Sequence, residues 1–111
     1  MIISNELKDF QRRLCALYNY LKIEEKTRFV NQEELKTHKN DFWNDPKNAE
    51  KIMKQIKKQK SWIKNYETVK SSIEDLTTLY EFFLDHEVTE DEIKLHFEAT
   101  RKVLEDIEFK M

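Results

Sequence analysis

The sequence contains no glycine, one proline and one cysteine among its 111 residues. Gly-rich phosphate loops and dinucleotide-binding turns are therefore excluded, because they need backbone conformations that only glycine adopts easily. Tight β-hairpins are disfavoured for the same reason, since their commonest turns are Asn-Gly and Asp-Gly. Together with a 39% apolar content, which is too high for a disordered chain of this kind, these absences predict an all-α fold.

Further absences concern the compartment. Cys15 is the only cysteine and cannot form an intrachain disulfide, which is typical of a reducing cytosol. Glu6 brings a charge into the region where a signal peptide needs its apolar segment. No run approaches the ~18 consecutive apolar residues of a membrane span. We therefore expect a cytoplasmic protein that does not contact a membrane.

Charge is abundant but unevenly distributed. Lysine and arginine number 20, aspartate and glutamate 22, and together they make up 38% of the chain. Residues 1–70 hold 16 basic and 10 acidic side chains, whereas residues 71–111 hold 4 and 12, so the two parts carry net charges of +6 and −8. This asymmetry favours electrostatic steering of one end towards an anionic partner.

Apolar residues at steps of three and four predict three helices. We expect the first over about residues 4–39, with a change of register near residue 23, where its seam breaks. Asp45-Pro46 is a strong start signal for a second helix over about 46–85. Thr89 and Glu92 form a capping-box pattern that begins a third helix over about 90–111. The first helix carries the apolar seam Leu7, Phe10, Leu14, Leu17 and Leu21.

Short connections make neighbouring helices antiparallel. Because the third helix is about half as long as the second, it should lie along the second only as far as about residue 65. We therefore predict a single domain, residues 1–111, consisting of an antiparallel three-helix bundle base and a two-helix coiled-coil-like arm. The base would comprise residues 4–23, 65–86 and 89–111. The arm would comprise residues 24–64, with Phe42 and Trp43 at its tip.

A lysine-rich stretch of the second helix is the clearest candidate site. No acidic residue interrupts it between Lys51 and Tyr66. The ordinary interpretation is a solvated helix face, and the functional one is a row of contacts to nucleic-acid phosphates. The lysines of this stretch are Lys51, Lys54, Lys57, Lys58, Lys60 and Lys64.

The tip aromatics, Phe42 and Trp43, are the second candidate. They either fold under the helix start as a local core or provide an anchor for a protein partner. Trp62 is expected at the flank of the core, and Cys15 is expected to be a small core residue. The three histidines are far apart and lack metal-binding spacing. We predict no catalytic residues, no metal ligands and no cofactor, and hence no enzyme.

Four segments of the sequence form a recognisable series. The most specific is Asn-Asp-Phe-Trp-Asn-Asp-Pro at residues 40–46, which Ala49 and the lysine-rich helix follow. The others are Leu-Tyr-Asn-Tyr-Leu at 17–21, Leu-Tyr-Glu-Phe at 79–82 and Glu-Phe-Lys-Met at 108–111. In this order, the segments resemble the N-terminal helical domain of bacterial peptide chain release factor 2.

The resemblance implies a role in translation termination, with the ribosomal stalk base region as partner. In that family, other domains read the stop codon with Ser-Pro-Phe and hydrolyse peptidyl-tRNA with Gly-Gly-Gln. The glycine-free sequence has neither motif, so we expect it to represent the ribosome-docking domain alone.

The lysines and the tip would make the ribosome contact, including contacts to rRNA phosphates. The alternative is a free-standing coiled-coil adaptor or dimerisation module unrelated to translation. A monomer would favour docking, and a tight dimer would favour the adaptor.

Overall fold

The computed structural model describes residues 3–111, which form four α-helices and one 3₁₀ turn. The α-helices are α1 (Ile3–Tyr20), α2 (Ile23–Thr37), α3 (Pro46–Leu84) and α4 (Glu90–Lys110), and the turn η1 (Phe42–Asn44) joins α2 to α3. No strand occurs within residues 3–111. None of the helices in this range combines the length and the apolar character that crossing a bilayer requires. The fold is therefore all-α.

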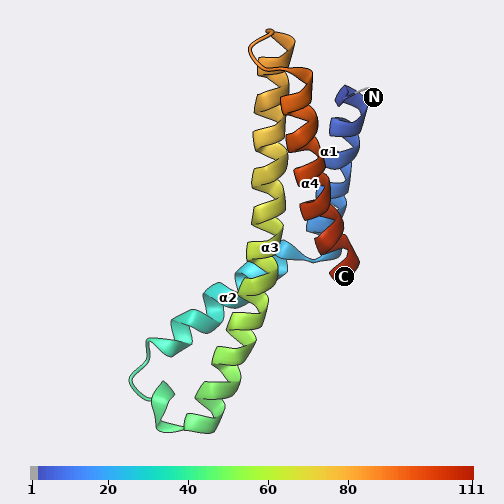
Figure 1. The fold of residues 1–111 in the computed structure, drawn as a ribbon. Coiled ribbons are helices and arrows are strands. Elements are labelled where there is room, and N and C mark those ends of the chain that lie inside the picture. The colour runs from blue at the N-terminus through green and yellow to red at the C-terminus, as the bar shows by residue number, and fades with distance from the viewer. Residues whose placement is uncertain (1–2) are drawn as a thin grey trace.

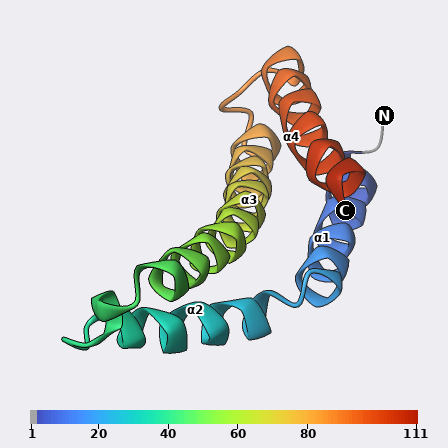
Figure 2. The same ribbon diagram turned by 90° about the horizontal axis from the view of Figure 1, so that it is seen from below.

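The long helix α3 runs the length of the molecule, which extends over 61 Å. Its C-terminal half lies beside α1 and α4, and its N-terminal half lies beside α2 (Figure 1). The view from below shows α2 leaving the end of α1 at a steep angle (Figure 2). The molecule thus has a three-helix base and a two-helix arm whose tip is η1. Since α1, α2 and α4 all run opposite to α3, each is antiparallel to α3, whereas α1 and α4, which pack on each other in the base, run in the same direction. The three-helix base and the two-helix arm agree with the sequence prediction.

One continuous helix over residues 4–39 was expected, and this prediction is wrong. The chain breaks at Leu21 and Lys22, and Lys22 has the left-handed backbone angles φ 53° and ψ 49°. The Lys26 ammonium donates a hydrogen bond to the Leu21 carbonyl, which the end of α1 leaves without a helical partner. The break coincides with the predicted change of register. The apolar side of α1 packs on α3 and α4 in the base, whereas the apolar side of α2 packs on the N-terminal half of α3.

The two strongest helix starts have the local structure that their residues indicate. Asp45 precedes Pro46, and its side chain accepts a hydrogen bond from the Asn48 backbone N–H at 3.3 Å. At the start of α4, the Glu92 N–H donates to the Thr89 hydroxyl at 3.1 Å, and the Thr89 N–H donates to the Glu92 carboxylate at 3.3 Å. These bonds satisfy backbone donors that helix formation leaves unpaired.

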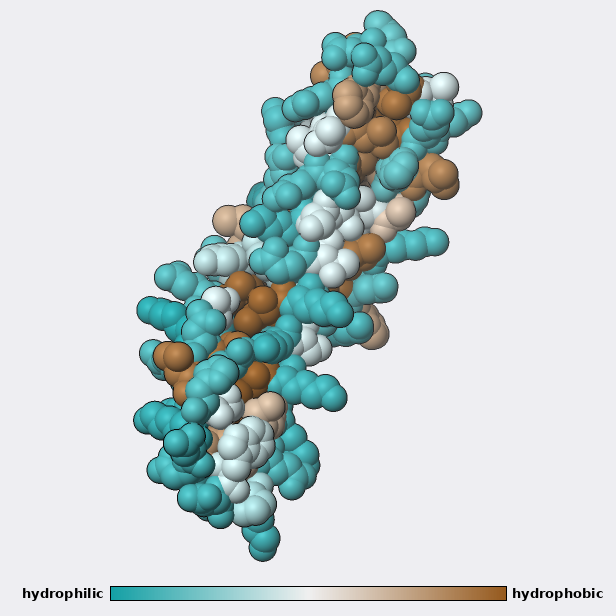
Figure 3. Space-filling view, turned by 90° about the vertical axis from the view of Figure 1, so that its left-hand side faces the viewer, coloured by the Kyte–Doolittle hydropathy of each residue, from teal (hydrophilic) through white to brown (hydrophobic). Residues whose placement is uncertain are grey.

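The core lies in the base. At its centre, the rings of Phe10 and Phe97 stack with centroids 4.7 Å apart, joining α1 to α4. The arm has a much thinner core, in which Val30, Ala49 and Ile56 are buried. Figure 3 shows apolar patches between polar side chains over both the base and the arm. The fully buried residues Leu17, Val69, Leu76, Ile93 and Leu104 complete the centre of the base.

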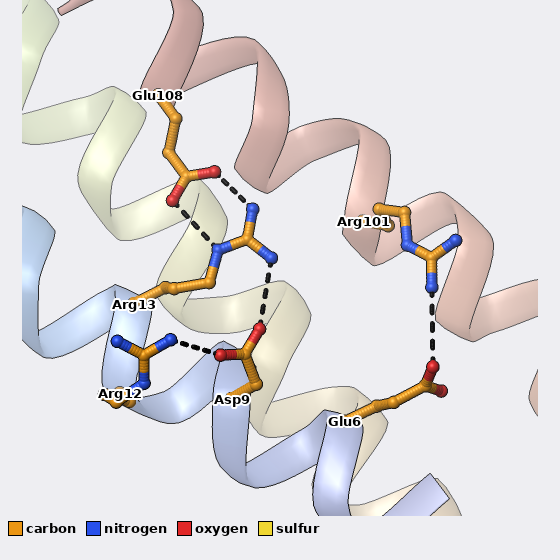
Figure 4. Close-up of polar contacts among 6 residues, drawn as sticks. All are labelled: Glu6, Asp9, Arg12, Arg13, Arg101 and Glu108. Carbon is orange, nitrogen blue, oxygen red and sulfur yellow. Dashed lines mark hydrogen bonds and ion pairs between the residues drawn. The ribbon is translucent and has the colours of Figure 1, made fainter. Parts of the chain in front are cut away.

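An ion-pair cluster fastens α1 to α4 (Figure 4). The Arg13 guanidinium donates two hydrogen bonds to the Glu108 carboxylate, one of them at 3.0 Å, and a third to Asp9 at 3.4 Å. These partners raise the pKa of Arg13, with the Glu108 bond as the main cause. A hydrogen bond from Arg12 lowers the pKa of Asp9. Because the bidentate pair joins two helices and is three-quarters shielded from water, it orients α1 on the base.

Removing Arg13 tests the contribution of this pair. We expect Arg13→Ala to lower the free energy of unfolding by about 1–3 kcal/mol, because it leaves Glu108 without its bidentate donor. Chemical denaturation followed by circular dichroism measures the change. Arg12→Ala is the matched control, since Arg12 is exposed and pairs only within α1; it should cost less than about 1 kcal/mol. Equal losses in the two variants would contradict this account.

The left-handed residue Lys22 gives a second prediction. A side chain with a Cβ is strained at positive φ, and glycine is not. We expect Lys22→Gly to raise the free energy of unfolding by about 0.5–1 kcal/mol and the β-branched Lys22→Val to lower it. The same denaturation measurement applies, with Lys8→Gly as the control inside α1. That control should destabilise by about 1 kcal/mol, and a loss of stability in Lys22→Gly would refute the strain argument.

Candidate functional site

Six exposed lysines of α3 form the candidate site, which we call the lysine ridge: Lys51, Lys54, Lys57, Lys58, Lys60 and Lys64. At ~1.5 Å per residue the ridge extends for about 20 Å along the arm. The isoleucines between them turn the other way, and Ile56 is only 4% exposed. The helical period therefore separates a basic face from the face that packs on α2.

The structure divides the ridge according to its ion pairs. The Lys60 ammonium lies 2.6 Å from the Glu34 carboxylate of α2, and Lys54 lies 3.0 Å from Glu50 one turn earlier. Lys51, Lys57, Lys58 and Lys64 form no ion pair with any residue in the range 3–111. Lys60 therefore helps to hold the arm together, whereas those four lysines leave their charge to the solvent.

Part of the lysine-bearing side of α3 in the arm continues the side of α3 that α4 covers in the base. At ~100° per residue, Val69 lies on the same side of α3 as Lys51 and Lys58. Val69 lines a narrow groove together with Val103 and Ile107 of α4. Within residues 3–111, α4 lies along this side of α3 in the base. Lys51 and Lys58 therefore continue the α4-facing side of α3 into the arm, whereas Lys60 turns towards α2.

Trp62 of α3 and Lys110 of α4 lie at the junction of the arm and the base. Trp62 is half-buried and packs against the core of the base, in agreement with its predicted position. With Lys110 it lines an open hollow of about 610 Å³, together with Lys54, Lys57, Lys58, Ser61 and Asn65. Sequence reasoning missed this combination, because Lys110 is far from the ridge along the chain and no motif joins them.

The tip aromatics Phe42 and Trp43 lie in η1. Their rings meet edge to face with centroids 4.8 Å apart. Phe42 is half-buried, and Trp43 is 57% exposed. Phe42 therefore matches the local-core interpretation, whereas Trp43 keeps the exposed surface that an anchor for a partner requires. The tip and the ridge lie on the same arm, joined by the first turn of α3.

Other candidates have no supporting arrangement. Cys15 was expected in the core, and this prediction is wrong: it is exposed. It lies between Leu14 and Leu17 on α1, but its side chain falls outside the stripe that faces α3 and α4. The Asn19 side-chain amide donates a hydrogen bond to its sulfur at 4.0 Å. Among residues 3–111, no group of His, Cys, Asp and Glu has a geometry that could hold a metal ion.

Comparison with known proteins gives a consistent family match. The PCRF domain model matches residues 23–111, beginning at the first residue of α2. Peptide chain release factor 2 of Borreliella burgdorferi is 30% identical over 100 residues, covering 90% of this chain and 26% of the relative. Peptide chain release factor 2 of a Nitratiruptor species is 30% identical over 87 residues, covering 78% and 24%. The chain thus spans about a quarter of the length of these relatives.

Proposed function

Because the chain belongs to the PCRF-domain family, we propose that it docks a peptide chain release factor on the ribosome during translation termination. The observation that carries this proposal is the lysine ridge on the arm. Four of its six ammonium groups have no carboxylate partner in residues 3–111, and the arm projects away from the base (Figure 1). An exposed row of unpaired cations is suited to the phosphates of ribosomal RNA.

The tip provides a second type of contact. Trp43 offers a large exposed aromatic surface at the far end of the arm, and such side chains are favoured anchors in protein–protein contacts. We propose that the tip meets a ribosomal protein while the ridge meets RNA. The resemblance to release factors suggests the region of the stalk base as the place of docking.

We propose that the chain itself has no catalytic role. Its sequence has neither the Gly-Gly-Gln nor the Ser-Pro-Phe motif of the family. Its contribution would be to position a factor whose chemistry is carried by other domains. Binding energy spent on docking would raise the local concentration of those domains at the ribosome.

The alternative, a coiled-coil dimerisation module, depended on the apolar seam of α1. Phe10 and Leu17 of that seam are only 2% and 1% exposed, because they are buried in the base of the same chain. A second copy therefore has no access to this seam in the folded monomer. This burial supports docking as a monomer over self-association.

Charge reversal on the ridge tests the proposal. In the release factor that carries this domain, we expect Lys51→Glu combined with Lys54→Glu and Lys58→Glu to weaken ribosome association at least tenfold. Loss of three phosphate contacts should also lower the slope of log affinity against log salt by about 2. Cosedimentation with ribosomes across a salt series measures both effects.

The control carries the same change in charge on the base. Lys8, Lys94 and Lys102 are exposed and lie on α1 and α4, away from the arm. Their triple replacement by glutamate should leave ribosome association within about twofold. Equal weakening by both triple variants would show that only net charge matters, and unchanged cosedimentation of the ridge variant would refute the proposal.

A further inference from the structure

We propose that the hollow around Trp62 binds an unpaired nucleotide of RNA, with its base stacked on the indole and its phosphates on the surrounding lysines. This inference rests on the proposed function, because a ribosome offers RNA at high local concentration. It goes beyond that function in assigning a base-stacking site at the junction of arm and base, away from the tip. We call the site the Trp62 hollow.

The chemistry of the lining favours RNA over other anions. The hollow of about 610 Å³ is bordered by four lysines, Lys54, Lys57, Lys58 and Lys110, and by no carboxylate. The lining also contains an aromatic plane, which a simple phosphate or an acidic peptide does not require. A ligand that combines negative charge with flat π faces matches both properties, and a single-stranded nucleic acid is such a ligand.

The position of Trp62 makes it a suitable platform. It packs against the base core, so its ring is held by neighbours and loses little freedom when a base stacks on it. It nevertheless lines the hollow, so part of the indole is accessible. Rigid support with one accessible surface is the arrangement that aromatic stacking platforms use.

Two polar side chains can add contacts to the base edge. Asn65 and Ser61 also line the hollow, and an amide or a hydroxyl can donate and accept hydrogen bonds. Asn65 and Lys110 also line the adjoining groove between α3 and α4, whose one acidic residue is Asp106. A bound strand would therefore follow the lysines of the arm and end near the C-terminal turn of α4.

The site forms only because two distant segments meet. Lys54, Lys57 and Lys58 belong to the arm, whereas Lys110 is the last residue of α4. The hollow thus brings cations from two elements around one indole.

Tryptophan fluorescence of the full chain tests the inference. The chain has two tryptophans, so Trp43→Phe leaves Trp62 as the only indole. We expect saturable quenching of its emission by an oligoadenylate of about six nucleotides, since stacking places the base against the indole. Inorganic polyphosphate of matched charge should bind without this quenching. Equal quenching by polyphosphate would overturn the stacking assignment.

Affinity measurements with labelled RNA provide a second test of the Trp62 hollow. We expect Trp62→Leu to weaken binding about tenfold, whereas Trp62→Phe, which keeps an aromatic plane, should weaken it less than threefold. Trp43→Leu is the matched control at the tip and should leave RNA affinity unchanged. Unchanged affinity in Trp62→Leu, or polyglutamate bound as tightly as RNA, would overturn the proposal.

A variant of an exposed residue tests the site even if Trp62→Leu does not fold. Lys110 is exposed at the end of α4, so Lys110→Ala should preserve the fold and lower the salt slope of RNA binding by about 0.7. Lys102→Ala, also exposed on α4, is the control and should leave the slope unchanged. Equal slopes for Lys110→Ala and the unmodified chain would count against the site.

The outcomes separate this inference from the proposed function. If the ridge variant loses ribosome association while Trp62→Leu keeps its RNA affinity, only the Trp62 hollow fails. If Trp62 is quenched by RNA while the ridge variant still associates with ribosomes, only the docking proposal fails.

Discussion

The unequal lengths of α3 and α4 are the constraint on which the rest of the structure depends. Helix α3 has 39 residues and α4 has 21, so antiparallel packing from their shared end covers only about half of α3. The covered half needs a third helix to complete a core, and α1 supplies it. The uncovered half has only α2 beside it and must turn its remaining sides to water. A base with a packed centre and an arm with a solvated lysine face both follow from this one mismatch.

Much of this architecture could be predicted from local patterns. Asp45 and Thr89 mark helix starts through bonds to residues three positions away, so their effect is visible in a short window of sequence. The broken seam indicated a change of register near residue 23, but the interruption of the helix at Leu21 and Lys22 could not be predicted, because neither glycine nor proline marks it. The helix breaks because α1 packs on α4 through Phe10, whereas α2 packs on the N-terminal half of α3 through Val30. Competition between these distant contacts, and not a local preference, ends α1.

In the candidate site, too, features within one helix could be predicted, whereas features that depend on contacts between helices could not. The lysine ridge could be predicted because all of its members lie within one helix and one helical period. The pairing of Lys60 with Glu34 could not, since it depends on how α2 lies against α3. The exposure of Cys15 likewise depends on the direction from which the base helices cover α1. The helix lengths predicted that the third helix lies along the second as far as about residue 65, but they could not predict that the side chains of Trp62 and Lys110 line one hollow.

The opposite charges of the two parts of the chain have a consequence for the approach to a partner. The molecule is 61 Å long but only 24 Å and 18 Å across; the arm lies in the basic part and the far end of the base in the acidic part. Near a polyanionic surface, such a rod experiences a torque as well as an attraction, because the field pulls one end and repels the other. The torque turns the rod so that the arm arrives first. A net charge of only −2 thus conceals a molecule that is oriented before it makes contact.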